Sequence, residues 1–158
     1  MRNTMIKKNG QRKLQIGNGY LLEFEQLTRI LNYLLERLSA KRINRNELQK
    51  ETGLSDRQIE GLVSMGSAIG LIKPRLQVLT SIGCLIAKHD IFFEKQGTLE
   101  WCHYIGAGSY RNLIWFETFN RLLQQHTSMT QEEWIKWFQT RLSGEFEERT
   151  ISKAARQE

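Results

Sequence analysis

Arg57 and Gln58 are the residues whose types and position suggest the most definite chemistry. They follow Ser55, a good helix N-cap, so both are expected in the first turn of a helix. In the major groove of DNA, an arginine can pair bidentately with guanine and a glutamine with adenine. Gly61 and Ser64 lie one turn apart on the same helix, where small residues permit close backbone approach. These four residues predict a surface that reads bases in double-stranded DNA.

Basic side chains on both sides of this helix are candidates for phosphate contacts. Arg42, Arg45 and Lys50 precede it, and Lys73 and Arg75 follow it on either side of a proline. Phosphate contacts supply most of the affinity of DNA-binding proteins and fix the register on the duplex. We therefore expect these five residues to anchor the DNA backbone.

The charge distribution agrees with a polyanionic partner for the first half of the chain. The 158 residues contain 23 Lys and Arg against 17 Asp and Glu, a net charge of +6. Residues 1–89 carry 15 of the basic and 7 of the acidic residues, whereas residues 90–158 carry 8 and 10. A basic excess favours nucleic acid as a partner but does not determine the fold.

Motifs for catalysis and for metal binding are weak. The glycines within 106–108 lack the Gly-Lys-Ser/Thr of a phosphate-binding loop. Cys84 and His89 are five residues apart, and Cys102 and His103 are adjacent, which is not the paired spacing of a structural zinc site. We therefore predict no enzymatic activity, no cofactor and no metal.

The elements that must position the DNA-reading residues are predicted by apolar periodicity and capping residues. A short helix, a glycine-containing turn and a second helix form a helix-turn-helix. Two apolar runs around a basic, proline-containing tip predict a small β-hairpin. The expected elements are a helix over 21–38, a short helix after Asn44, a turn at 52–54, a helix from 55 to about 69, a hairpin over 71–79 and a helix capped by Thr80.

Aromatic residues concentrate in the second half, where 12 of the 15 lie between Phe92 and Phe146. Helices are expected over about 98–105, 110–125 and 130–142. Trp134 and Trp137 in the last of these have two interpretations. They form part of a hydrophobic core, or they supply a surface for a protein partner or a homodimer.

These observations predict a mainly α fold, a winged helix-turn-helix with a small β-hairpin wing and an aromatic-rich helical extension. The expected organisation is a basic arm over 1–19, the winged helix over 20–90, the extension packed on it over 91–145 and a polar tail over 146–158. The arm is either a solvated tail or a segment that binds polyanions. The chain has no apolar run of the length that a membrane helix needs, no secretion signal and no disulfide pattern, so we expect a cytoplasmic protein.

Several segments resemble an uncharacterised bacterial winged-helix family, over about residues 20–150. The resemblance is carried by the segments 51–60 (ETGLSDRQIE), 68–72 (AIGLI), 79–83 (LTSIG), 88–90 (KHD), 97–104 (GTLEWCHY) and 115–120 (WFETFN). Members of that family often lie beside phosphosulfate-reductase-like, DNA-phosphorothioation and other defence genes. The family's recognition helix is commonly more basic than the one here, which carries Glu60, Val63 and Ser67.

The expected function is that of a non-catalytic DNA-binding protein. The resemblance implies a regulator or accessory factor of a bacterial defence, DNA-modification or mobile-element system. The alternative is a winged-helix adaptor that docks on a larger nucleoprotein complex, since winged helices also bind proteins.

Overall fold

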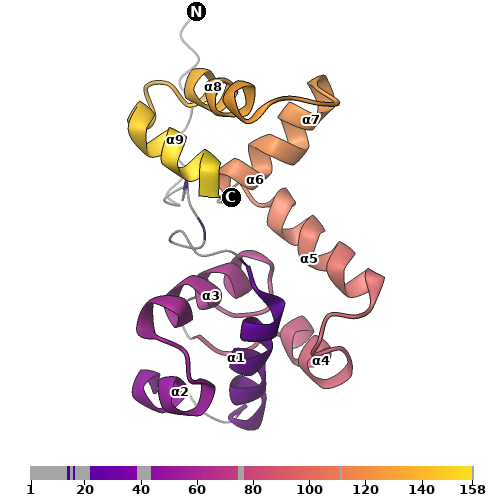
Figure 1. Cartoon of the computed structure of the whole chain (residues 1–158). Coiled ribbons are helices and arrows are strands. Elements are labelled where there is room, and N and C mark those ends of the chain that lie inside the picture. The colour runs from indigo at the N-terminus through magenta and orange to yellow at the C-terminus, as the bar shows by residue number, and fades with distance from the viewer. Residues whose placement is uncertain are drawn as a thin grey trace, which may run out of the picture.

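The computed structural model is mainly helical and places the helices in two lobes joined by α5 (Figure 1). It describes residues 14, 16, 22–38, 44–74, 77–110 and 112–157. The first lobe contains α1 (Phe24–Glu36), α2 (Arg45–Thr52), α3 (Asp56–Ala68) and α4 (Ser81–His89). After α5 (Gln96–Gly108), the second lobe contains α6 (Leu113–Glu117), the π-helical turn η1 (Thr118–Leu122), α7 (Leu123–Gln125), α8 (Gln131–Arg141) and α9 (Glu148–Gln157).

The predicted starts of α2, α3 and α4 are confirmed, because their capping side chains make the expected hydrogen bonds. The helix predicted over 21–38 is shorter and runs from Phe24 to Glu36, without a side-chain cap. The Asn44 side chain accepts from the backbone N–H groups of Asn46 and Glu47 at the start of α2. Ser55 and Gln58 form a reciprocal capping box on α3. Thr80 caps α4 through the Gly83 N–H at 2.9 Å.

The first lobe encloses its own hydrophobic cluster, which follows from the apolar stripe of each helix. Leu27, Ile30 and Leu31 of α1 are completely buried against α3 and α4. Leu48 from α2 and Leu62 from α3 complete the centre. This core holds α2 and α3 in a fixed orientation.

The segment between α3 and α4 contains one isolated antiparallel bridge, between Ile72 and Leu79, and no strand among its described residues. The Lys73 N–H donates to the Val78 carbonyl at 2.8 Å, and the Thr80 N–H to the Leu71 carbonyl at 2.9 Å. Gln77 has a φ of 54°, which interrupts the extended conformation that a longer ladder requires. The predicted hairpin is thus reduced to a short chain reversal.

The second lobe has a separate cluster built from α6, η1, α8 and α9. Phe138 of α8 and Ile151 of α9 are completely buried in it. The region 146–158, predicted to be a polar tail, therefore contains a packed helix. Leu14 also belongs to this cluster and Ile16 is buried, although both fall within the predicted arm.

Close contacts at the end of α5 join the two lobes. A Cβ on Gly106 would lie 2.6 Å from the Trp115 ring, so only glycine lets that ring pack on α5. The Asn112 side chain donates to the Gly106 carbonyl at 3.0 Å and to the Ala68 carbonyl at 3.3 Å. The C-terminal end of α3 is therefore tied to the beginning of the second lobe.

Candidate nucleic-acid interface

The turn between α2 and α3 determines where the predicted base-reading residues lie. Gly53 ends α2 with a φ of +69°, in the left-handed region that glycine adopts without strain. Its N–H donates to the Gln49 carbonyl at 2.9 Å, and the following Leu54 is buried. Ser55 then starts α3, so the two helices are separated by a three-residue turn. The order of capped helix, glycine-containing turn and capped helix is the one expected for a helix-turn-helix.

Arg57 is exposed in the first turn of α3 and makes no ion pair with the described residues. Two acidic residues, Asp56 and Glu60, are exposed close to it on the same helix. The guanidinium is therefore available, on a surface with little net charge.

Gln58 has a structural role that the sequence analysis missed. Its Oε1 accepts hydrogen bonds from the Ser55 N–H at 2.9 Å and the Ser55 hydroxyl at 2.8 Å. Its amide nitrogen lies 3.5 Å from the Gln26 Oε1. Both ends of the amide are engaged, so reading adenine would require the capping box to open. The spacing Ser-x-x-Gln is a recognised capping signal and could have revealed this.

Gly61 and Ser64 are not brought to the exposed face together with Arg57. Gly61 is buried and Ser64 is half-buried, because α3 packs into the first cluster along most of its length. The burial of Gly61 and the partial burial of Ser64 argue against the prediction that these small residues open the helix backbone to DNA. Of the four predicted readers, Arg57 alone is exposed.

The predicted phosphate anchors differ in how free their charges are. Arg45 lies 3.4 Å from the Asp56 carboxylate, so part of its charge is neutralised by α3 itself. Lys50 and Lys73 are exposed and make no ion pair with the described part of the chain. Arg42 and Arg75 lie outside the described residues.

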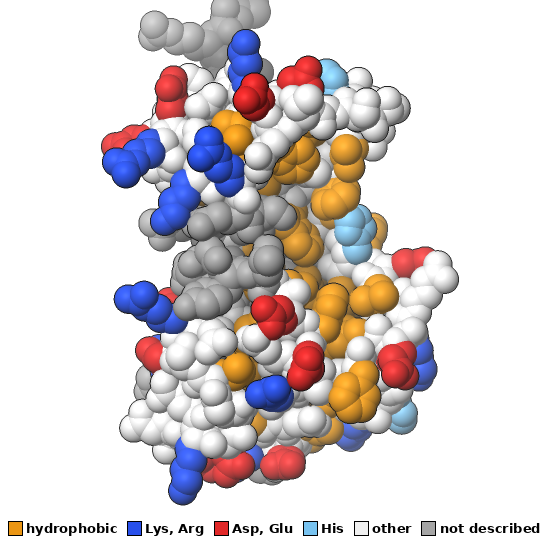
Figure 2. Space-filling model, viewed as in Figure 1, with side chains coloured by type: hydrophobic (Ala, Val, Ile, Leu, Met, Phe, Trp, Pro, Cys, Tyr) orange, Lys and Arg blue, Asp and Glu red, His pale blue; other side chains and the backbone are white. Residues whose placement is uncertain are grey.

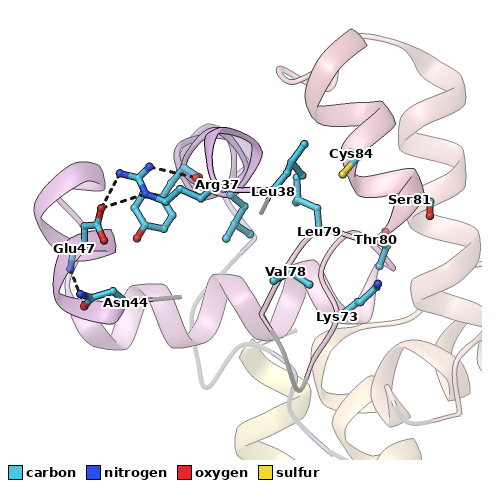
Figure 3. Close-up of a pocket in the computed structure, with 12 residues that line it drawn as sticks. Arg37, Leu38, Asn44, Glu47, Lys73, Val78, Leu79, Thr80, Ser81 and Cys84 are labelled. Atoms are coloured by element: carbon cyan, nitrogen blue, oxygen red, sulfur yellow. Dashed lines mark hydrogen bonds and ion pairs between the residues drawn. The ribbon is translucent and has the colours of Figure 1, made fainter. Parts of the chain in front are cut away.

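A cavity of about 340 Å³, lined in part by Lys73, lies between α1, α2, α4 and the chain reversal (Figure 3). Leu38, Val78 and Leu79 line it with apolar groups. On its α2 side, Arg37 lies 2.8 Å from the Glu47 carboxylate and is stacked on the Tyr33 ring at 4.0 Å. The Arg37 charge is thus committed within the fold.

Trp134 and Trp137 are both half-buried and pack against the second cluster. The Trp134 indole N–H donates to the Ala155 carbonyl at 3.0 Å, which fixes that ring between α8 and α9. Both tryptophans contact the Phe138 ring edge-on, at centroid distances of 5.2 and 5.0 Å. The core interpretation fits Trp134, whose indole N–H is engaged within the fold, and the partner surface stays a prediction.

The exposed large apolar side chains lie elsewhere, mainly on α4, α5 and the loop between them. Tyr104 is 73% exposed and Phe92 is 68% exposed. Figure 2 shows hydrophobic side chains running along one side of the molecule from the first lobe to the second. The exposed set is Leu38, Leu85, Phe92, Leu99, Trp101, Tyr104, Tyr110 and Leu123.

Reactive groups are not assembled into a site in the described residues. Burial raises the pKa of the Cys102 thiol to about 11, which makes it a poor nucleophile near neutral pH. No group of three His, Cys, Asp or Glu side chains in the described ranges lies in a position to bind a metal ion. None of the helices described is both long and apolar enough to cross a membrane.

Comparison of the chain with protein-family models, with curated proteins and with solved structures gives no match. The resemblance to a bacterial winged-helix family thus stays a prediction based on the segments quoted above.

Proposed function

We propose that this chain is a non-catalytic DNA-binding protein that inserts the N-terminal end of α3 into the major groove. The observation that carries the proposal is the three-residue turn around Gly53, which joins two capped helices and leaves Arg57 exposed, without an ion pair to any described residue. A recognition helix contacts base edges through the residues at its N-terminal end. Arg57 pairs with guanine, and Gln58 serves mainly to cap the helix.

Phosphate contacts come from both sides of α3. Lys50 on α2 and Lys73 on the chain reversal are exposed cations, and Arg45 joins them when DNA phosphate replaces Asp56 as its partner. The segment 71–80 takes the place of the wing, shortened to a single bridge. The cellular role implied by the family resemblance is regulation or assistance of a bacterial defence, DNA-modification or mobile-element system.

The experiment is fluorescence anisotropy of a labelled mixed-sequence duplex over a series of salt concentrations. We expect affinity to fall steeply as salt rises, because binding releases counterions from the phosphates. Lys73→Ala should weaken binding to all duplexes and lower the salt slope by about 1. Lys88→Ala is the matched control, since Lys88 is an exposed lysine at the other end of α4. Absence of binding at low salt would overturn the proposal.

A second candidate function, a winged-helix adaptor, is favoured by the exposed apolar side chains of α4 and α5. Contiguous apolar surface on a monomer is typical of protein-binding sites. If the chain is an adaptor, Trp101→Ser with Tyr104→Ser abolishes assembly and Lys73→Ala has no effect. Multi-angle light scattering of the purified chain shows whether the partner is a second copy. A chain that is monomeric at all concentrations and binds DNA would favour the first function alone.

A further inference from the structure

A second basic surface lies far along the chain from α3, in the half with the acidic net charge. A groove of about 520 Å³ runs between the η1–α7 segment and α8. Arg121 of η1 and two cations of α8, Lys136 and Arg141, line it. Trp137, which follows Lys136 in the sequence, also lines the groove. Arginine, lysine and tryptophan are the side chains that bind phosphates and stack on bases.

A buried carboxylate holds the two arginines at this groove. Glu117 is 2% exposed, and its Oε2 lies 2.9 Å from the Arg141 Nε and 3.4 Å from the Arg121 Nε. Each arginine contacts Glu117 through its Nε, and the terminal nitrogens of both make no hydrogen bond with the described residues. Two guanidinium groups share one negative charge, and their free edges match the geometry of a phosphate.

The remaining charges leave the groove positive. Lys136 is exposed and makes no ion pair within the described ranges. The Glu133 carboxylate also lines the groove and accepts from the Thr130 N–H at 2.7 Å and the Thr130 hydroxyl at 3.0 Å. These hydrogen bonds lower the pKa of Glu133, so it is ionised and contributes a negative charge. Arg121, Lys136 and Arg141 together outnumber Glu117 and Glu133 by one charge. His126 also lines the groove.

Trp137 and the backbone of η1 support a binding role. The Phe138 ring touches Trp137 edge-on, with an interplanar angle of 83°, and Trp137 is half-buried at the groove wall. Any base can stack on an aromatic side chain, because every base has a flat π-face. Arg121 belongs to a π-helical turn, a rare conformation that is frequent at functional sites.

We propose that this groove binds a nucleotide unit, with its phosphate between Arg121, Arg141 and Lys136 and its base against Trp137. The unit is either a free nucleotide or part of a single-stranded nucleic acid, since both carry a phosphate beside an aromatic base. The site is separate from the α3 surface and does not depend on the proposed function.

The test uses anisotropy of a fluorescein-labelled oligothymidylate of about twelve nucleotides, a length that suits single-strand sites. The full chain should bind it with an affinity that falls as salt rises. Lys136→Gln should lower the salt slope by about 0.7, the value for one phosphate contact on a single strand. Arg141→Lys should weaken binding, because lysine pairs with Glu117 but lacks the forked guanidinium. Lys153→Gln, an exposed lysine on α9, is the matched control and should bind as the unchanged chain does.

Competition identifies the source of the nucleotide. Displacement of the labelled strand by adenosine monophosphate indicates a free nucleotide, whereas displacement only by unlabelled strand indicates a single-stranded nucleic acid. Equal displacement by inorganic phosphate would overturn the stacking role of Trp137. Absence of strand and nucleotide binding at low salt, or unchanged binding by both Lys136→Gln and Arg141→Lys, would overturn the proposal. Arg57→Ala should leave strand binding unchanged, so failure of the duplex proposal is read separately.

Discussion

The α3 surface and the α8 groove differ in how their cations are used. The first half of the chain is strongly basic, yet Arg45 is paired with Asp56 and Arg37 with Glu47. The second half is acidic overall, yet Arg121 and Arg141 share one buried carboxylate. Net charge alone therefore does not indicate which cations are available to an anion, because that depends on the ion pairs that each cation makes within the fold.

Phe138→Ala should have the largest effect and should disrupt the second lobe while leaving the first lobe folded. Phe138 is completely buried in the second cluster, and its removal should lower the free energy of unfolding by about 3–5 kcal/mol. Binding of the oligothymidylate should be lost, while duplex binding by α3 persists because the first lobe has its own cluster. Urea unfolding measures the stability change. Phe92→Ala, at an exposed phenylalanine, should leave stability nearly unchanged, and an equal loss there would contradict this account of the core.

Replacing both arginines that pair with Glu117 should have the next largest effect on stability. Arg121→Ala with Arg141→Ala leaves a buried carboxylate without an ion pair among the described residues, which costs about 3 kcal/mol or more. Adding Glu117→Gln should restore part of the stability without restoring strand binding. Thermal unfolding of the double and triple variants checks this. Restored binding in the triple variant would show that the guanidinium groups do not contact the ligand.

Gln58→Ala should have a smaller effect, on stability rather than on sequence preference. Loss of the capping box on α3 should cost about 0.5–2 kcal/mol. Gln58→Glu preserves the acceptor and should retain most of the stability, since glutamate also completes a capping box. Urea unfolding and duplex selection experiments measure the two properties. A relaxed preference at an adenine position would assign Gln58 a reading role as well.

Local sequence signals predicted the elements of the first lobe well, because capping and periodicity act over a few residues. Asn44, Ser55 and Thr80 start helices as expected. In contrast, α9 was missed because its buried stripe combines one isoleucine with Ala154 and Ala155, which contribute little hydrophobicity. An isolated helix as short as α9 is only marginally stable, and packing against α8 supplies the stabilisation that it needs.

The candidate sites were predictable only in part, because they depend on contacts between distant residues. The exposure of Arg57 follows from its place in the first turn of α3. The burial of Gly61 depends on how α3 packs into the first lobe, and no spacing indicates it. The Glu117–Arg121 pair has the i,i+4 spacing of a helical ion pair, but Arg141 joins it from 24 residues away.

The most direct test of the central claim compares duplex binding by the unchanged chain and by Arg57→Ala in the anisotropy assay. We predict that Arg57→Ala loses about 1–3 kcal/mol of binding free energy on the preferred duplex and relaxes the sequence preference. Arg149→Ala, an exposed arginine on α9, should bind as the unchanged chain does. Equal binding by all three proteins, at every salt concentration, would contradict the assignment of α3 as a recognition helix.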